Sequence, residues 1–261
     1  MTRVPDEAAV AALLQRAWTI PSLRREDRKK ARELAALLPS LARLLGPPAS
    51  AARRLLVDAA AGHGYVAGAA AALLGARRLV LLERDAARVS RAEEALARIA
   101  AELGAPLDVR AVAASTSDAA AWPAAPDVVV ALHACGRAAD EILDAAAAAR
   151  ARHLLVVPCC YARAVAFSPR AEELAAALEA GRHAEPRRRI VEGLVDTERA
   201  LRLEAAGYEV VIEPFAPPTV TGHNLALRAR RVGEPRRAEA ARAALRRLHG
   251  GALSSKTDDR G

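Results

Sequence analysis

Val57-Asp58-Ala59-Ala60-Ala61-Gly62-His63-Gly64-Tyr65 is the stretch that decides the fold, because it joins a short apolar run to a helix-like segment through very small residues. The apolar run begins at Arg54, and the helix-like segment continues to Leu74. A strand, a turn without bulky side chains and a helix in this order allow a ligand to approach the backbone closely. The stretch therefore predicts a ligand site at the carboxyl end of a buried strand.

The same unit recurs along the chain. Short apolar runs that are typical of buried strands occupy residues 54–58, 79–83, 107–112, 127–132 and 153–157. Helical patterns separate several of these runs, at residues 65–74, 86–103 and 140–150. Alternating buried strands and helices predict an α/β fold, a parallel sheet with helices on both faces. Two further strand-like runs, at residues 208–215 and 224–230, predict a closing hairpin whose last strand is antiparallel to the rest.

Composition shifts divide the chain into three regions. We expect an N-terminal helical extension, the sheet domain, and a basic helix with a disordered tail, at residues 1–48, 49–233 and 234–261. Pro39 is expected to separate a helix at residues 26–38 from a short turn of helix at residues 41–45, because proline interrupts helices. Gly46-Pro47-Pro48 then ends the extension.

The chain of 261 residues carries a formal net charge of +8. A positive field of this size favours phosphate-bearing partners, although an arginine-rich composition alone gives the same total. Two basic segments, at residues 187–189 and 236–248, are either RNA contacts or solvated charged faces. The sequence leaves the oligomeric state open.

Cysteine usage and hydropathy predict a cytoplasmic protein. The three cysteines, Cys135, Cys159 and Cys160, are too few for a disulfide framework and are typical of a reducing compartment. No apolar region follows the charged residues 1–7, and no apolar run reaches the roughly 18 to 20 residues that a membrane helix needs. We therefore expect neither a signal peptide nor a membrane partner.

Two acids at strand ends suggest the kind of ligand. Asp58 precedes the small-residue turn, where it would repel a pyrophosphate but suit a ligand that carries an ammonium and a sulfonium. Glu83 ends the second strand, where a carboxylate accepts hydrogen bonds from both ribose hydroxyls. The acid at Asp58 and the lack of a Gly-x-Gly-x-x-Gly spacing count against a nicotinamide-dependent oxidoreductase.

Residues 57–65 resemble the first motif of class I S-adenosylmethionine-dependent methyltransferases, Asp-x-Gly-x-Gly-x-Gly, with Ala60 where the first glycine is usual. The resemblance implies a Rossmann-like fold with a mostly parallel seven-stranded sheet and S-adenosylmethionine as cofactor. It implies cofactor contacts from the strand ends and the loops that follow them, at Asp58, Ala60, Gly62, Gly64, Tyr65, Glu83, Asp118 and His133. Asp118 either accepts from the adenine amino group or caps a helix.

A second group of reactive side chains follows the fourth and fifth strands. His133 and Cys135 end the fourth strand, and Cys159, Cys160 and Tyr161 end the fifth. Because adjacent parallel strands end at the same edge of a sheet, these side chains are expected to gather near the transferable methyl group. The cysteines either fill tight positions as small apolar groups or bind zinc, or some of these residues act on the substrate. Adjacent cysteines point to opposite faces of a strand, which argues against a metal site.

Leu-His-Ala-Cys-Gly (132–136) and Pro-Cys-Cys-Tyr (158–161) resemble the Leu-His-x-Cys-Gly and Cys-Cys-Tyr/His motifs of a particular methyltransferase-domain family. This family includes methyltransferase-like proteins and is similar to the eukaryotic tRNA ribose methyltransferases. The resemblance extends over about residues 50–230, with Thr221 and Asn224 matching a Thr-x-x-Asn stretch. It implies an RNA substrate in some members.

We therefore expect an S-adenosylmethionine-dependent methyltransferase with tRNA or rRNA as the favoured acceptor. The alternatives are a protein or small-molecule acceptor, or a non-catalytic module that binds the cofactor or RNA. The candidate catalytic residues are His133, Cys135, Cys159 and Tyr161. His133 would take the proton of a hydroxyl or ring nitrogen, Tyr161 would stack on a flat acceptor, and Cys159 would add covalently to a pyrimidine if carbon-5 were methylated.

Overall fold

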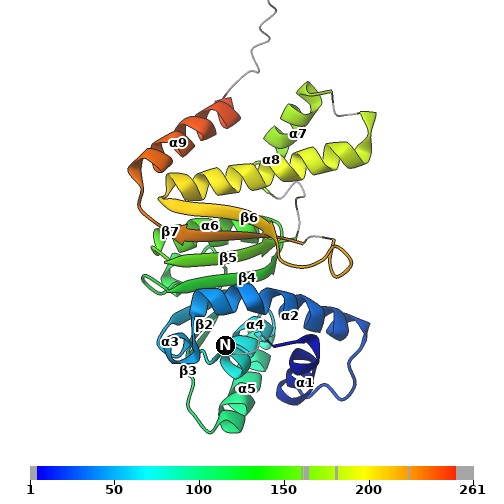
Figure 1. The fold of residues 1–261 in the computed structure, drawn as a ribbon, viewed down its shortest axis with the longest axis vertical. Coiled ribbons are helices and arrows are strands. Elements are labelled where there is room, and N and C mark those ends of the chain that lie inside the picture. Colours follow the sequence, from blue (N-terminus) through cyan, green and yellow to red (C-terminus); the bar gives the residue numbers. More distant parts are fainter. Residues whose placement is uncertain (1–4, 160, 162–164, 180–181, 223, 251–261) are drawn as a thin grey trace, which may run out of the picture.

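The computed structural model describes residues 5–159, 161, 165–179, 182–222 and 224–250, and its ribbon is drawn in Figure 1. A seven-stranded sheet forms its centre, in the order β3-β2-β1-β4-β5-β7-β6. The strands span β1 Leu55–Ala59, β2 Arg78–Glu83, β3 Asp108–Ala113, β4 Val128–Ala134, β5 His153–Pro158, β6 Tyr208–Pro214 and β7 Leu225–Arg231. Strands β1 to β5 pair in parallel, whereas β7 is antiparallel to both β5 and β6. The predicted α/β class and its antiparallel closing strand are confirmed.

Helices cover both faces of the sheet. They span α1 Glu7–Ala17, α2 Arg25–Leu45, α3 Pro48–Ala51, α4 Tyr65–Leu74, α5 Ala86–Leu103, α6 Arg137–Ala148, α7 Ser168–Ala177, α8 Ala184–Ala205 and α9 Pro235–Gly250, with a short 3₁₀ turn η1 at Ala119–Ala121. Figure 1 shows α1, α2, α4 and α5 at one end of the molecule and α7, α8 and α9 at the other. In the part of the chain that the structure describes, no helix is long and apolar enough to cross a membrane. The predicted disordered tail lies outside the described residues from position 251 onward.

The predicted break at Pro39 is wrong, because α2 runs through it from Arg25 to Leu45. An interior proline removes one helical hydrogen bond and costs about 3 kcal/mol. Burial of one face of the helix offsets this cost, since Leu34, Leu37 and Leu41 are fully buried. A buried leucine side chain contributes about 1.5–3 kcal/mol, so three of them outweigh the proline.

The N-terminal helices share a core with the sheet. Val10 and Leu14 of α1 and Leu38 of α2 belong to the same buried cluster as Leu56 of β1 and Leu81 of β2. A second cluster, on the other face, packs α6 and the end of α8 against the sheet. Helices α1 and α2 therefore form part of one face of the fold.

A notch in α4 receives the indole of Trp18. A Cβ atom at Gly68 would lie 2.4 Å from Cη2 of Trp18 and 3.1 Å from Cδ1 of Ile99. We therefore expect Gly68→Ala to lower the free energy of unfolding by about 1–3 kcal/mol, measured by urea denaturation, because the overpacked ring must move. Gly193→Ala is the matched control, since a Cβ there meets nothing within 4 Å and alanine stabilises an open helix position by about 0.5–1 kcal/mol. Equal effects of the two substitutions would contradict the prediction.

Candidate active site

A cavity of about 950 Å³ opens at the carboxyl ends of the central strands. It is lined by the turn after β1, the ends of β2 and β4, and the loop after β3. Its volume falls within the roughly 300–1,000 Å³ of small-molecule sites, and its place is the usual ligand position in open α/β sheets. The following side chains determine what it can bind.

Asp58 lies near the end of β1 with only 2% of its surface exposed. Its Oδ2 accepts a hydrogen bond from the backbone N–H of Ala67, 3.0 Å away, which ties the carboxylate to the first turn of α4. Burial and, to a smaller extent, the charge of Glu83 raise the pKa of Asp58, the hydrogen bond from Ala67 lowers it, and the net pKa is about 8. A buried carboxylate in this state is best stabilised by a cation from a ligand.

The affinity for S-adenosylhomocysteine, which carries an ammonium group, is therefore expected to rise with pH. Below pH 8 the carboxyl of ligand-free Asp58 holds a proton that a cationic ligand must displace, so affinity should increase up to tenfold per pH unit from pH 6 and level off above 8. Calorimetric titrations at several pH values measure this slope. Asp58→Asn should bind more weakly and show a flat profile, whereas a flat wild-type profile would contradict the assignment.

Glu83 ends β2 and connects two loops. Its Oε2 accepts from the N–H of Gly62 at 2.9 Å, and its Oε1 accepts from the N–H of Asp85 at 3.1 Å. Each carboxylate oxygen can accept a second hydrogen bond, and Glu83 lines the cavity, so a ribose diol can bind there. The two buried acids thus fit a ligand that combines cationic groups with a ribose, as S-adenosylmethionine does.

The turn between β1 and α4 is left-handed at three positions, with φ of +56° at Ala60, +57° at Gly62 and +74° at Gly64. Ala60, which stands where the family motif has glycine, tolerates this conformation at a cost of about 1–2 kcal/mol. Three of the residues that were predicted to bind the cofactor, Ala60, Gly62 and Tyr65, line the cavity. Gly64 does not line it, because its backbone packs on α5, where an added Cβ would lie 2.7 Å from that of Ala92.

Asp118 caps the turn η1. Its Oδ1 accepts from the N–H of Ala120 at 3.0 Å, and its side chain does not line the cavity. The structure thus shows the capping role that the sequence left open as the alternative to an adenine contact.

His133 lies at the cavity on a distortion of β4. The pairing of β4 with β5 shifts register between Leu132 and Ala134, and His133 has a φ of +65°. Such bulges redirect a side chain at a strand end. Nε2 of His133 lies 2.8 Å from Oε2 of Glu33 on α2.

Sequence reasoning did not identify Glu33. Its side chain is only 2% exposed, and it lies on the buried side of α2 together with Leu34 and Leu37. Burial raises its pKa, but the hydrogen bond with His133 and the charge of Lys30 outweigh this and hold it at about 2. A lone acid among the regularly spaced apolar residues of an amphipathic helix is the sequence signal that could have identified Glu33.

The predicted gathering of residues from β4 and β5 is only partial. His133 and Cys135 line the cavity, whereas Cys159 and Tyr161 do not, and Cys160 lies outside the described residues. The hydroxyl of Tyr161 donates to Oδ2 of Asp196 on α8 at 2.8 Å. This bond places Tyr161 against α8 instead of at the cavity, so stacking on an acceptor there does not agree with its position.

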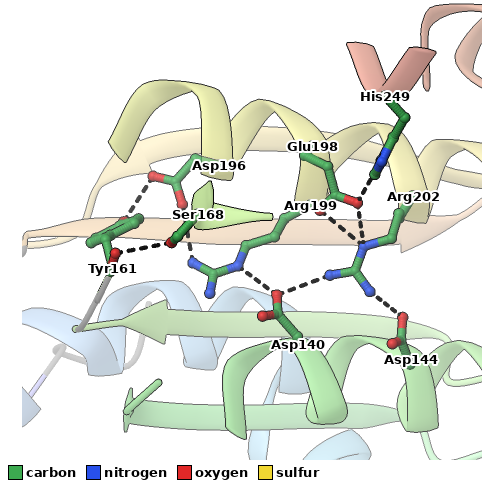
Figure 2. A network of polar contacts seen from close by, with 9 residues as sticks. All are labelled: Asp140, Asp144, Tyr161, Ser168, Asp196, Glu198, Arg199, Arg202 and His249. Carbon is green, nitrogen blue, oxygen red and sulfur yellow. Dashed lines mark hydrogen bonds and ion pairs between the residues drawn. The ribbon is translucent and has the colours of Figure 1, made fainter. Parts of the chain in front are cut away.

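Tyr161 belongs to a buried polar network between α6 and α8 (Figure 2). Arg199, with a side chain 1% exposed, places Nε 2.8 Å from Asp140 and Nη1 3.4 Å from Asp196. Its guanidinium also lies over the ring of Tyr161, 5.4 Å from the centroid. Arg202 extends the network along α8 and pairs with the same Asp140 at 2.9 Å. The network fixes Tyr161 to the helices on that face.

The predicted basic segment 187–189 lies within α8 and is largely neutralised. Arg187 pairs with Glu172 of α7, and Arg188 and Arg189 pair with Glu185 one turn earlier. Charges that are matched in this way offer little to an RNA phosphate, so the solvated-face interpretation describes this segment better.

Comparison with known proteins bears on the identity of the chain. A family model described as "Methyltransferase domain" matches residues 29–166. No curated protein matches. Solved structures with a similar fold include magnesium protoporphyrin IX methyltransferase from Synechocystis PCC 6803 with bound SAH, at 13% identity and a TM-score of 0.47, covering 87% of this chain and 100% of that one. A fibrillarin/Nop5p complex matches at 13% identity and a TM-score of 0.48, covering 78% and 83%.

The family match includes both strand-end acids, the small-residue turn, and the dyad of Glu33 and His133. The sheet order with its reversed last strand agrees with the class I arrangement expected from the motif. The chain belongs to the methyltransferase-domain family and is a class I enzyme that takes its methyl group from S-adenosylmethionine.

Proposed function

We propose that this methyltransferase acts on RNA. The observation that carries the proposal is a second depression of about 780 Å³ that adjoins the cofactor cavity through two shared lining residues, His63 and Tyr65. We call it the ring groove, because Trp18, His63 and Tyr65 line it together with Arg24, Arg91 and Arg98.

The rings of the groove are held in place by the fold. The centroid of Tyr65 lies 4.8 Å from that of Trp18 and 5.7 Å from that of His63. The indole N–H of Trp18 donates to the backbone oxygen of His63 at 2.8 Å. Fixed aromatic faces of this kind stack on unpaired bases and contribute about 1–3 kcal/mol per base.

Cations surround these rings. Arg24 and Arg91 are exposed at the groove, and Lys30 and Arg84 line the neighbouring cavity. Asp27 and Glu94 also line the groove, but arginines outnumber them there. Rings beside cations, on a chain with a net charge of +8, match the chemistry of a single-stranded RNA segment. The motif resemblance to tRNA ribose methyltransferases supports the same class of acceptor.

On this proposal the nucleotides beside the target bind in the ring groove, while the target nucleotide enters the cavity toward His133. His133 takes the proton from the acceptor atom. Cys135 also lines the cavity and is exposed.

The test uses RNA isolated from cells that lack the enzyme, incubated with the full-length protein and labelled S-adenosylmethionine. We expect label in RNA, and Arg91→Glu should raise the KM for RNA at least tenfold and flatten its dependence on salt. The affinity for S-adenosylhomocysteine should not change. Arg230→Glu, on the distant strand β7, is the control and should leave both quantities unchanged. Label in protein alone, or an RNA KM that Arg91→Glu does not alter, would overturn the proposal.

A further inference from the structure

We propose that Glu33 is the positioning residue for His133 as a proton acceptor, and that the methyl acceptor is an atom that must lose a proton, such as a hydroxyl oxygen or a ring N–H. The inference rests on the proposed role of His133 at the cavity and names the class of acceptor atom. Helix α2, which lies outside the motifs at the strand ends, thereby positions His133 through Glu33.

The geometry of the pair is that of a carboxylate–histidine dyad. Oε2 of Glu33 lies 2.8 Å from Nε2 of His133, one partner almost fully buried and the other at the cavity surface. The bulge in β4 brings the imidazole to this position, and the buried leucine face of α2 fixes the carboxylate. Both partners are thus held by packed elements.

The contact determines the tautomer of the imidazole. A carboxylate can only accept, so Nε2 of a neutral His133 must carry the proton that it donates to Glu33. Nδ1 is then the ring nitrogen that keeps a lone pair. An imidazole oriented in this way by a carboxylate is a general base whose conjugate acid the carboxylate stabilises.

The surroundings of Glu33 favour its ionised form. Lys30 and Lys29 lie 3.2 Å and 3.8 Å from its two oxygens, and with His133 they are the charged or titratable groups described beside it. Its buried Oε1 has no hydrogen-bond partner among the described residues. The pKa of Glu33 at about 2 means that it is ionised at neutral pH.

Methyl transfer to such an acceptor is accompanied by proton transfer to His133. The lone pair of the acceptor atom forms the bond to the methyl carbon, the sulfur–methyl bond breaks, and its electrons stay on sulfur. The proton of the acceptor passes to Nδ1 of His133, which becomes an imidazolium beside the Glu33 carboxylate. An acceptor that is already deprotonated at neutral pH, such as a carboxylate, gains nothing from this dyad.

The test compares full-length wild type with Glu33→Ala and Glu33→Gln. We expect Glu33→Ala to lower kcat about 10²-fold, within the range of general-base catalysis, while KM for S-adenosylmethionine stays within twofold. Glu33→Gln, whose amide oxygen can still accept from Nε2–H, should fall between Glu33→Ala and wild type. Glu26→Gln, an exposed acid on the same helix, is the matched control and should behave as wild type.

A second readout needs no acceptor, so it separates failure of this inference from failure of the RNA proposal. Two-dimensional ¹H–¹⁵N spectra of the imidazoles, assigned with His133→Gln, should show the Nε2–H tautomer in wild type and a tautomer mixture in Glu33→Ala. Wild-type kcat in a folded Glu33→Ala protein, or an Nδ1–H tautomer in the wild type, would overturn the inference. An acceptor other than RNA with the predicted kcat loss would retain the dyad and overturn only the choice of RNA.

Discussion

Glu83→Ala is expected to weaken the binding of S-adenosylhomocysteine about 10²-fold. The substitution removes the acceptors for the ribose diol, and it also releases the N–H groups of Gly62 and Asp85 that the carboxylate now ties together. A hydrogen bond to a charged group contributes about 1.5–3 kcal/mol, so losing two of them at the lower end of this range corresponds to about two orders of magnitude in Kd. Calorimetric titration of the folded variant measures the change directly.

Two further variants make this result specific. Glu83→Gln keeps one acceptor and should lose less affinity than Glu83→Ala. Glu93→Ala, an exposed position on α5, should bind as wild type does. Wild-type affinity in a well-folded Glu83→Ala protein would show that the cavity does not bind the ribose at the end of β2.

The strand-end acids were predictable because their positions follow from chain order alone. A short apolar run that ends in Asp58 and another that ends in Glu83 place both acids at one edge of a parallel sheet, without knowledge of any side-chain contact. The same reasoning could not give their hydrogen bonds. It assigned Asp58 to a cationic ligand, whereas the structure shows that the carboxylate also caps α4.

Contacts between distant segments were beyond the reach of sequence patterns. Glu33 and His133 are separated by 100 positions, and their pairing depends on how α2 packs against β4. Because adjacent parallel strands end at one edge of a sheet, this rule assigned both His133 and Tyr161 to the cavity. It was right for His133 but not for Tyr161. The rule fails there because Asp196 of α8 accepts the tyrosine hydroxyl, and that partner lies 35 positions further along the chain.

The second large effect concerns Arg199→Ala, which is expected to lower the free energy of unfolding by about 3–5 kcal/mol. The variant leaves the carboxylate of Asp196 without its buried cation and that of Asp140 with Arg202 as its remaining partner, and an uncompensated buried charge has a cost of this size. Urea denaturation followed by circular dichroism measures it. Affinity for S-adenosylhomocysteine should change little in the folded variant, because none of these groups lines the cofactor cavity.

The expected loss of stability depends on how deeply the ion pair is buried and not on the distance between its partners. Arg230 and Glu209 approach to 2.7 Å, as close as the 2.8 Å of Arg199 and Asp140, yet the side chain of Arg230 is 61% exposed and that of Arg199 only 1%. Solvent screens the exposed pair, so Arg230→Ala should cost no more than about 1 kcal/mol. If the two alanine variants lost equal stability, the network of Figure 2 would contribute no more to the free energy of unfolding than a surface ion pair does. Another contact would then have to hold Tyr161 in place. A difference of several kcal/mol would show that Tyr161 is held by a desolvated charge, independently of the site that binds the cofactor.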